Sequence, residues 1–99
     1  MVLYIDTTDF NSATFALGGK RLIKKSYRID SRHSAGILEK LDGFLKSAKI
    51  KISEIKKIVV NKGPGSFTGT RVGVVHAQAL GFALDIPVSF ISADKFKIG

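Results

Sequence analysis

The chain has 99 residues, which is the size of one domain, so we do not expect a two-lobed enzyme. Of these residues 44% are hydrophobic and 24% charged, which is typical of a globular domain and excludes a disordered or fibrous protein. No apolar run approaches the roughly 20 residues that cross a bilayer, and there is no cysteine for a disulfide, a thiolate zinc site or a nucleophile, so we expect a cytoplasmic protein without a membrane partner. The formal net charge is +8, and with His33 and His76 as the only histidines we expect no metal site.

The first third of the chain predicts three antiparallel strands. Residues 2–5 form a short apolar run that is rich in β-branched side chains, which favours a buried strand. Residues 13–17 and 21–29 predict two further strands. We expect Gly18 and Gly19 between them to take positive φ in a tight hairpin.

The remainder predicts two helices that alternate with two strands. Ser31 can cap a first helix, a strand follows at residues 58–60, and a second helix at residues 70–84 precedes a strand at residues 88–91. The order β-β-β-α-β-α-β indicates an α/β domain with a mixed sheet and helices packed on it. The first helix carries an apolar stripe, expected to face the sheet, of Ile37, Leu38, Leu41, Phe44, Leu45 and Ala48.

The positive charge is concentrated in one region. Residues 20–62 contain 13 basic and four acidic residues. Such a region favours either an acidic partner, such as RNA, or simply a solvated face. Alternation along the third strand puts Lys20, Lys24 and Arg28 on one face as candidate tRNA contacts, and a strand that is basic on both faces is expected at a sheet edge.

A glycine-rich loop lies between the fourth strand and the second helix. Its spacing fits neither a Walker A loop nor a dinucleotide-binding fingerprint. Two interpretations stay open: a sharp turn whose Ser66, Thr68 or Thr70 caps the helix, or a site where backbone N–H groups meet an anion or nucleotide. The loop consists of Gly63, Pro64, Gly65, Ser66, Phe67, Thr68 and Gly69.

The string GPGSFTGTRVG at residues 63–73 closely resembles the signature of the TsaB (YeaZ) family. The opening Ile5-Asp6-Thr7-Thr8 resembles that family's first strand and turn, and Arg32-His33-Ser34 and residues 86–92 are similar too. The resemblance implies one lobe of the actin, sugar kinase and Hsp70 (ASKHA) superfamily, with a ribonuclease H-like fold. Residues 1–99 would form this N-terminal lobe alone, with the family's second lobe absent. Whether the chain is a fragment or a reduced form stays open.

The resemblance also implies a function in making threonylcarbamoyladenosine beside the anticodon of tRNA. This chain would be a non-catalytic subunit that pairs with and activates a TsaD-like threonylcarbamoyltransferase, with a TsaE-like ATPase and tRNA in the same assembly. No cofactor would be required by this chain, and ATP with magnesium would bind only in the assembled complex. Two alternatives are a small ATP-binding phosphotransferase or ATPase lobe of the same superfamily and a tRNA-binding module.

Two groups of residues are candidates for these roles. Asp6, Thr7 and Thr8 match the place of a superfamily nucleotide site, here vestigial, although Asp before Thr-Thr is also an ordinary turn. Partner pairing is expected through the two helices. The second helix is apolar on all sides, and the first carries a strip of small residues. When the chain is alone, we expect a homodimer. The predicted interface comprises His33, Gly36, Ile37, Lys40, Gly43, Arg71, Val74, Val75 and Gln78.

Overall fold

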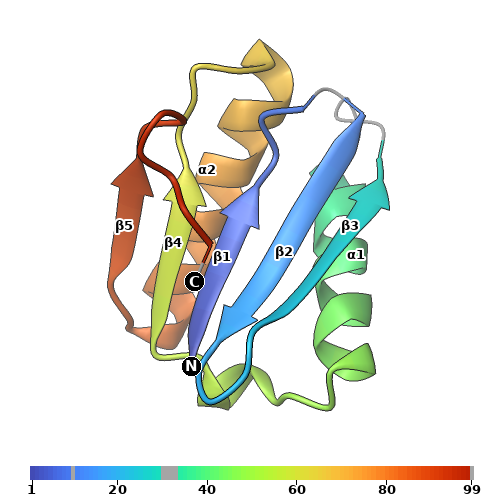
Figure 1. Ribbon diagram of the computed structural model, residues 1–99, viewed down its shortest axis with the longest axis vertical. Helices are drawn as coiled ribbons and strands as arrows, with labels where there is room; N and C mark the ends of the chain where they lie inside the picture. Colours follow the sequence, from blue (N-terminus) through green and yellow to red (C-terminus); the bar gives the residue numbers. More distant parts are fainter. Residues whose placement is uncertain (10, 30–33, 99) are drawn as a thin grey trace.

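The structure, a computed structural model, describes residues 1–9, 11–29 and 34–98 and confirms the expected order of elements (Figure 1). His33 of the predicted interface and the predicted cap Ser31 lie outside the described residues. One short 3₁₀ helix, η1, is added to the order. The elements are β1 (Val2–Asp6), β2 (Ser12–Gly18), β3 (Ile23–Arg28), α1 (Ser34–Ser47), η1 (Ile52–Glu54), β4 (Lys57–Asn61), α2 (Phe67–Leu84) and β5 (Val88–Ile91).

The five strands form one mixed sheet in the order β3-β2-β1-β4-β5. β2 pairs antiparallel with both β1 and β3, whereas β4 pairs parallel with β1 and β5. Short turns suffice for the antiparallel pairs, and the two helical crossovers supply the parallel ones. β3 is an edge strand, as its basic pattern predicts.

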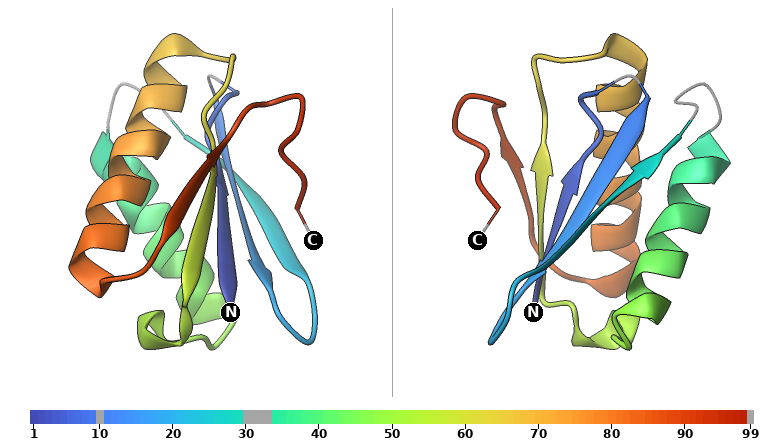
Figure 2. Two further views of the ribbon diagram at one scale, coloured as in Figure 1. Left: turned by 90° about the vertical axis from the view of Figure 1, so that its left-hand side faces the viewer. Right: turned by 45° about the vertical axis from the view of Figure 1, so that its right-hand side comes forward.

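Both helices cover the same face of the sheet (Figure 2). Alternation along the strands turns Leu3, Ile5 and Phe15 toward this face, where they are buried. The Phe15 ring lies 5.9 Å from the ring of Phe44 on α1, centroid to centroid. On the opposite face, the C-terminal segment after β5 crosses the sheet. The core therefore lies between the helices and the sheet.

Three local expectations are wrong. Gly18 and Gly19 do not take positive φ, because β2 and β3 are joined by a longer connection at residues 19–22. α2 begins at Phe67 rather than at residue 70. Leu38 does not face the sheet, since its side chain is 54% exposed.

No helix in the described part of the chain is both long and apolar enough to cross a membrane.

Candidate partner interface

The glycine loop packs against the turn that follows β1. Ser66 N–H donates to the Thr8 carbonyl over 2.6 Å, and a Cβ at Gly65 would lie 2.5 Å from the Cβ of Thr8. Gly63 has φ of 91° and donates its N–H to Asn61 Oδ1 at 3.0 Å. The glycines are thus needed for a positive φ and for close approach to a neighbouring segment. These contacts support the turn interpretation, and an anion or nucleotide contact at this loop stays a prediction.

Ser66 is the residue that caps α2. Its hydroxyl accepts a hydrogen bond from Gly69 N–H at 3.3 Å, so one of the three predicted caps is confirmed. The predicted alternative Thr70 lies within the helix instead, with a buried hydroxyl oxygen that has no hydrogen-bond partner among the described residues. Because Ser66 caps the helix, α2 begins at Phe67, three residues before the expected start.

The side chains of the candidate nucleotide triplet bind one another and the loop. Asp6 Oδ1 accepts from Thr8 N–H at 3.0 Å and from Thr8 Oγ1 at 2.7 Å, which is an Asx turn. Thr7 Oγ1 donates to the Gly69 carbonyl at 2.6 Å. The Thr7 side chain is fully buried, which favours a packing role for it, and the vestigial nucleotide site stays a prediction. The described contacts give all three residues a structural role.

α2 has two faces of opposite character. On one face, small residues recur every four positions, at Gly69, Gly73, Ala77 and Gly81, and all four are buried. A Cβ added at Gly73 would overlap Thr7 Oγ1, so these residues let the helix lie close to the sheet. The outward face carries larger side chains, and all of these are exposed: Phe67, Arg71, Val75, Gln78 and Phe82.

The apolar side chains on this outward face are highly exposed to solvent. Val75 is 59% exposed, Phe67 75% and Phe82 91%. The Arg71 guanidinium lies over the Phe67 ring, 5.0 Å from its centroid. An exposed apolar stripe of this kind marks an interaction surface more often than a free surface.

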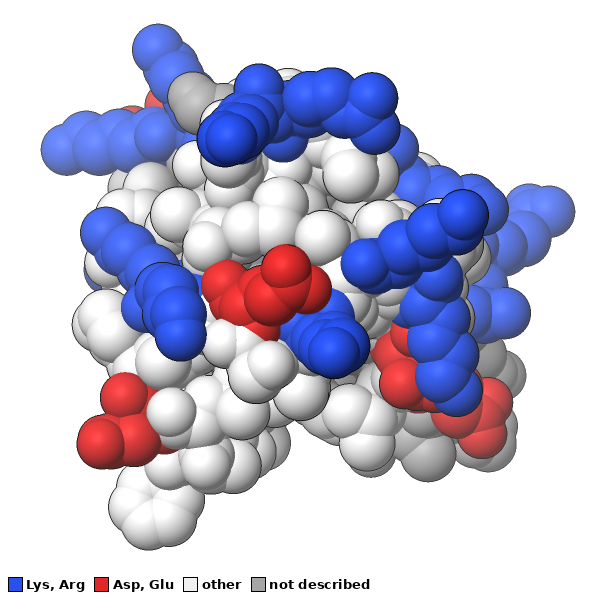
Figure 3. Space-filling model, turned by 90° about the horizontal axis from the view of Figure 1, so that it is seen from below, with Lys and Arg blue, Asp and Glu red and all other residues white. Residues whose placement is uncertain are grey.

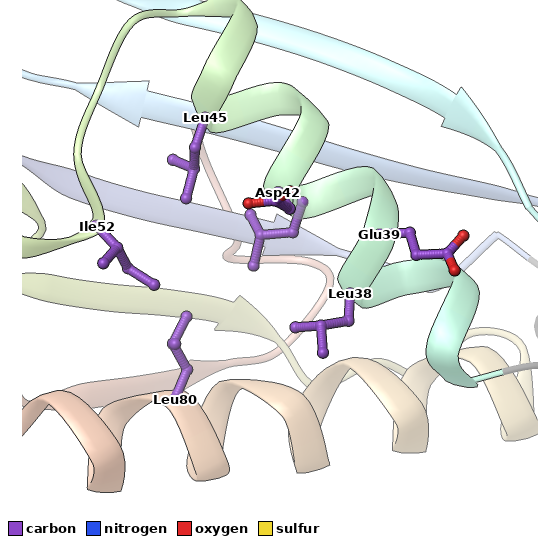
Figure 4. Close-up of a pocket in the computed structure, with 7 residues that line it drawn as sticks. Leu38, Glu39, Asp42, Leu45, Ile52 and Leu80 are labelled. Atoms are coloured by element: carbon purple, nitrogen blue, oxygen red, sulfur yellow. The ribbon is translucent and has the colours of Figure 1, made fainter.

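A groove of about 500 Å³ lies between the two helices (Figure 4). Leu38 and Leu45 from α1 and Ile52 from η1 project toward Leu80 of α2 across it. Glu39 and Asp42 lie at its border, and Asp42 forms an ion pair with Lys46 at 2.9 Å. The groove therefore has an apolar floor. The charged side chains described at its border, Glu39 and Asp42, both belong to α1.

The structure brings together only part of the predicted interface. Arg71, Val75 and Gln78 share the outward face of α2, whereas Val74 is half-buried and packs against the core. Ile37 is wrong as an interface residue, because it is 2% exposed and belongs to the core.

The small residues of α1 do not face the groove. At about 3.6 residues per turn, Gly36, Lys40 and Gly43 lie on the side of the helix opposite Leu38 and Leu45. A Cβ at Gly36 or Gly43 would meet no atom within 4 Å. The predicted strip on α1 and the apolar stripe on α2 therefore form two separate surfaces.

Sequence reasoning missed Leu38, Ile52 and Phe82. The four-residue spacing of small residues in α2 is the signal that identifies its inner face and hence puts Phe82 outside. No comparable signal was available for Leu38 and Ile52, because both fit an apolar core pattern.

The candidate tRNA contacts lie away from the helices. Lys24 and Arg28 pair with Ala16 and Ser12 of β2, on the open face of the sheet. Lys20 precedes β3, in the connection from β2, and all three basic side chains are exposed.

Comparison with known proteins shows the family to which this chain belongs. Residues 28–93 match the protein family described as TsaD, tRNA N6-adenosine threonylcarbamoyltransferase. The chain belongs to this family, as a TsaB (YeaZ)-type member. Its fold is the actin-like, ribonuclease H-like fold.

Individual relatives support the TsaB-type assignment. The tRNA threonylcarbamoyladenosine biosynthesis protein TsaB of Bacillus subtilis is 33% identical over 93% of this chain and 41% of its own length. YeaZ from Pseudomonas aeruginosa superposes with a TM-score of 0.81 at 30% identity, over 92% of this chain and 43% of that one. A tRNA N6-adenosine threonylcarbamoyltransferase of Staphylococcus epidermidis is 41% identical over 61% of this chain and 18% of its own length. The chain thus spans less than half the length of these relatives.

Proposed function

We propose that this chain is a non-catalytic lobe in tRNA threonylcarbamoyladenosine biosynthesis, which pairs with and activates a TsaD-like threonylcarbamoyltransferase. Its similarity to proteins named for this pathway supports the process. A TsaE-like ATPase and tRNA complete the proposed assembly, this chain requires no cofactor of its own, and ATP with magnesium would bind only in the assembled complex. The absence of cysteine from the sequence supports a cytoplasmic setting for it.

The outward face of α2 is the observation that carries the pairing. Of the large apolar side chains that the structure describes as exposed, Phe67, Val75 and Phe82 lie on this one helix. Leu38 and Ile52 line the groove beside it. A related α/β lobe with its own helix pair would cover both features, and a second copy of this chain would do so when the partner is absent.

The test measures association of the purified chain with a TsaD-like protein and the resulting threonylcarbamoyl transfer to tRNA. Burying a phenylalanine side chain contributes about 1.5–3 kcal/mol, so Phe82→Ser should raise the Kd roughly 10- to 100-fold and reduce activation correspondingly. Leu22→Ser is the matched control, because Leu22 is 53% exposed in the β2–β3 connection. Equal affinity of the Phe82→Ser variant and the wild type would refute the proposed interface.

A second comparison distinguishes the two surfaces of the helices. Gly43→Leu adds a bulky side chain on the flank of α1 that is turned away from the groove, and we expect it to leave pairing and self-association unchanged. Sedimentation of each variant alone at micromolar concentrations reports on the homodimer. Loss of association in Gly43→Leu but not in Phe82→Ser would move the interface to the α1 flank.

A further inference from the structure

The fold gathers six exposed cations at one end of the molecule. The β2–β3 connection, the segment between α1 and η1 and the start of β4 all lie at the end where β1 begins. Met1 joins them, since its carbonyl accepts from Lys56 N–H at 2.8 Å. We call this surface the basic end, and it comprises Lys20, Arg21, Lys49, Lys51, Lys56 and Lys57.

Little negative charge offsets these cations. Figure 3 views the molecule from this end, where blue side chains surround a smaller acidic group. Glu54 is the one acid between Lys49 and Lys57, and its Oε2 accepts from Lys51 N–H at 2.7 Å. Within the described residues, none of the six cations forms an ion pair. The surface therefore keeps a positive field that attracts a polyanion.

An apolar recess opens within the basic end. It has a volume of about 340 Å³, with Met1, Ile23, Ala48 and Ile50 in its lining and Lys20 and Arg21 at its side. Ligand pockets start at about 300 Å³, so this recess accommodates one flat group rather than a helix. An arginine guanidinium beside such a space can stack on a nucleobase while neighbouring lysines contact phosphates.

We propose that the basic end binds an unpaired segment of RNA, with one base in the recess against Arg21 and the backbone phosphates on the surrounding lysines. Two observations favour RNA over an acidic protein surface. The cations come from three separate segments at the end of the molecule that holds the recess, where Lys20 and Arg21 line it, and Lys24 and Arg28 continue the positive surface along edge strand β3. The inference deepens the proposed function, because in that setting the RNA is the tRNA substrate.

The first test uses the whole chain and a fluorescein-labelled hairpin RNA with an unpaired loop, followed by anisotropy at several salt concentrations. Removing three phosphate contacts from a single strand should flatten the slope of log K against log salt by about 2. The basic-end variant combines Lys20→Gln, Lys49→Gln and Lys51→Gln. The control variant has the same net charge and combines Lys62→Gln, Lys95→Gln and Lys97→Gln.

We expect weaker binding and a flatter slope in the basic-end variant, and wild-type values in the control. Equal losses in the two variants would show a general charge effect and overturn the proposal, as would wild-type binding by the basic-end variant. Circular dichroism of both variants checks that they are folded.

The second test concerns the recess. Arg21→Lys keeps the charge but removes the planar group, and stacking is worth about 1–3 kcal/mol per base, so affinity for the hairpin should fall at least about fivefold. Affinity for a fully paired duplex of the same length should not change. An equal effect on both RNAs would overturn the assignment of a base to the recess.

Association with the TsaD-like protein is measured on the same variants and keeps this inference separate from the pairing proposal. We expect the basic-end variant to pair normally. A variant that keeps RNA binding but loses pairing would identify an acidic protein as the occupant and overturn the RNA assignment. RNA binding without any pairing would refute the proposed function and leave this inference standing.

Discussion

The close approach of α2 to the sheet makes Gly73 a position where one methyl group should be costly. Gly73 is buried beneath the Thr7 side chain, and an added Cβ would overlap Thr7 Oγ1 and lie 3.2 Å from Thr7 Cβ. Thr7 itself is fully buried and donates to the Gly69 carbonyl one helical turn earlier. Gly73→Ala therefore forces either the helix or the threonine to move.

The expected loss of stability has three contributions. Overpacking a core costs about 1–3 kcal/mol, and a buried hydroxyl that loses its hydrogen bond costs about 1–3 kcal/mol more. Alanine favours a helix over glycine by about 1 kcal/mol, which offsets part of this. The sum predicts that Gly73→Ala lowers the free energy of unfolding by about 3 kcal/mol, equivalent to a Tm decrease of roughly 10–25 °C in a chain of this size.

Urea and thermal denaturation, followed by circular dichroism at one low protein concentration, measure the effect. Gly43→Ala is the matched control, because its Cβ meets no neighbour and the same exchange should raise stability by about 0.5–1 kcal/mol. In a double-mutant cycle with Thr7→Ala, the loss at Gly73 should shrink, since the overlapping oxygen is gone. A Gly73→Ala protein as stable as the wild type would refute the close-approach reasoning.

Two further substitutions test the turn at the end of β1 and the start of α2. Ser66→Ala removes the hydroxyl that accepts from Gly69 N–H and should lower the free energy of unfolding by about 1 kcal/mol; an unchanged urea midpoint would contradict its role as the cap. Asp6→Ala removes the acceptor of both Thr8 hydrogen bonds and should cost about 1 kcal/mol, whereas Asp6→Asn keeps an acceptor oxygen and should retain most of that stability in the same denaturation assay.

The strands and their order could be predicted because apolar alternation and turn residues are local signals. The same alternation correctly assigned Lys24 and Arg28 to one face of an edge strand. The two glycines at residues 18 and 19 gave a misleading signal, because glycine permits positive φ but does not require it, and the longer connection makes no use of it.

The orientation of the helices about their axes could not be predicted equally well. In α1, Ile37 and Leu38 are adjacent and both apolar, yet one lies in the core and the other borders the groove. Hydrophobicity alone does not show which of the two is in the core, because that depends on the position of α2. In α2 the apolar residues surround the axis, so the inner face is determined by the residues small enough to approach the sheet, such as Gly73 and Gly81.

The arrangement of the charged residues in space could not be predicted from the sequence either. The sequence locates an excess of cations within residues 20–62 but not their convergence in space. Lys20 and Lys56 are far apart in the chain and reach the same end because β2 runs opposite to β1 whereas β4 runs parallel to it. Topology, rather than any local motif, forms the basic end.

The inner face of α2 also explains why its outer face should bind another protein. Glycine and alanine let the helix lie close to β1 and β4, but they bury little apolar side-chain area in doing so. Three large apolar side chains of the helix, those of Phe67, Val75 and Phe82, are left outside, with Phe82 91% exposed and Val75 59% exposed. Most of the hydrophobic free energy available to these outer side chains is therefore realised only when a second surface covers them. Close packing within the lobe and the proposed association through its outer face thus have the same origin in the spacing of small residues.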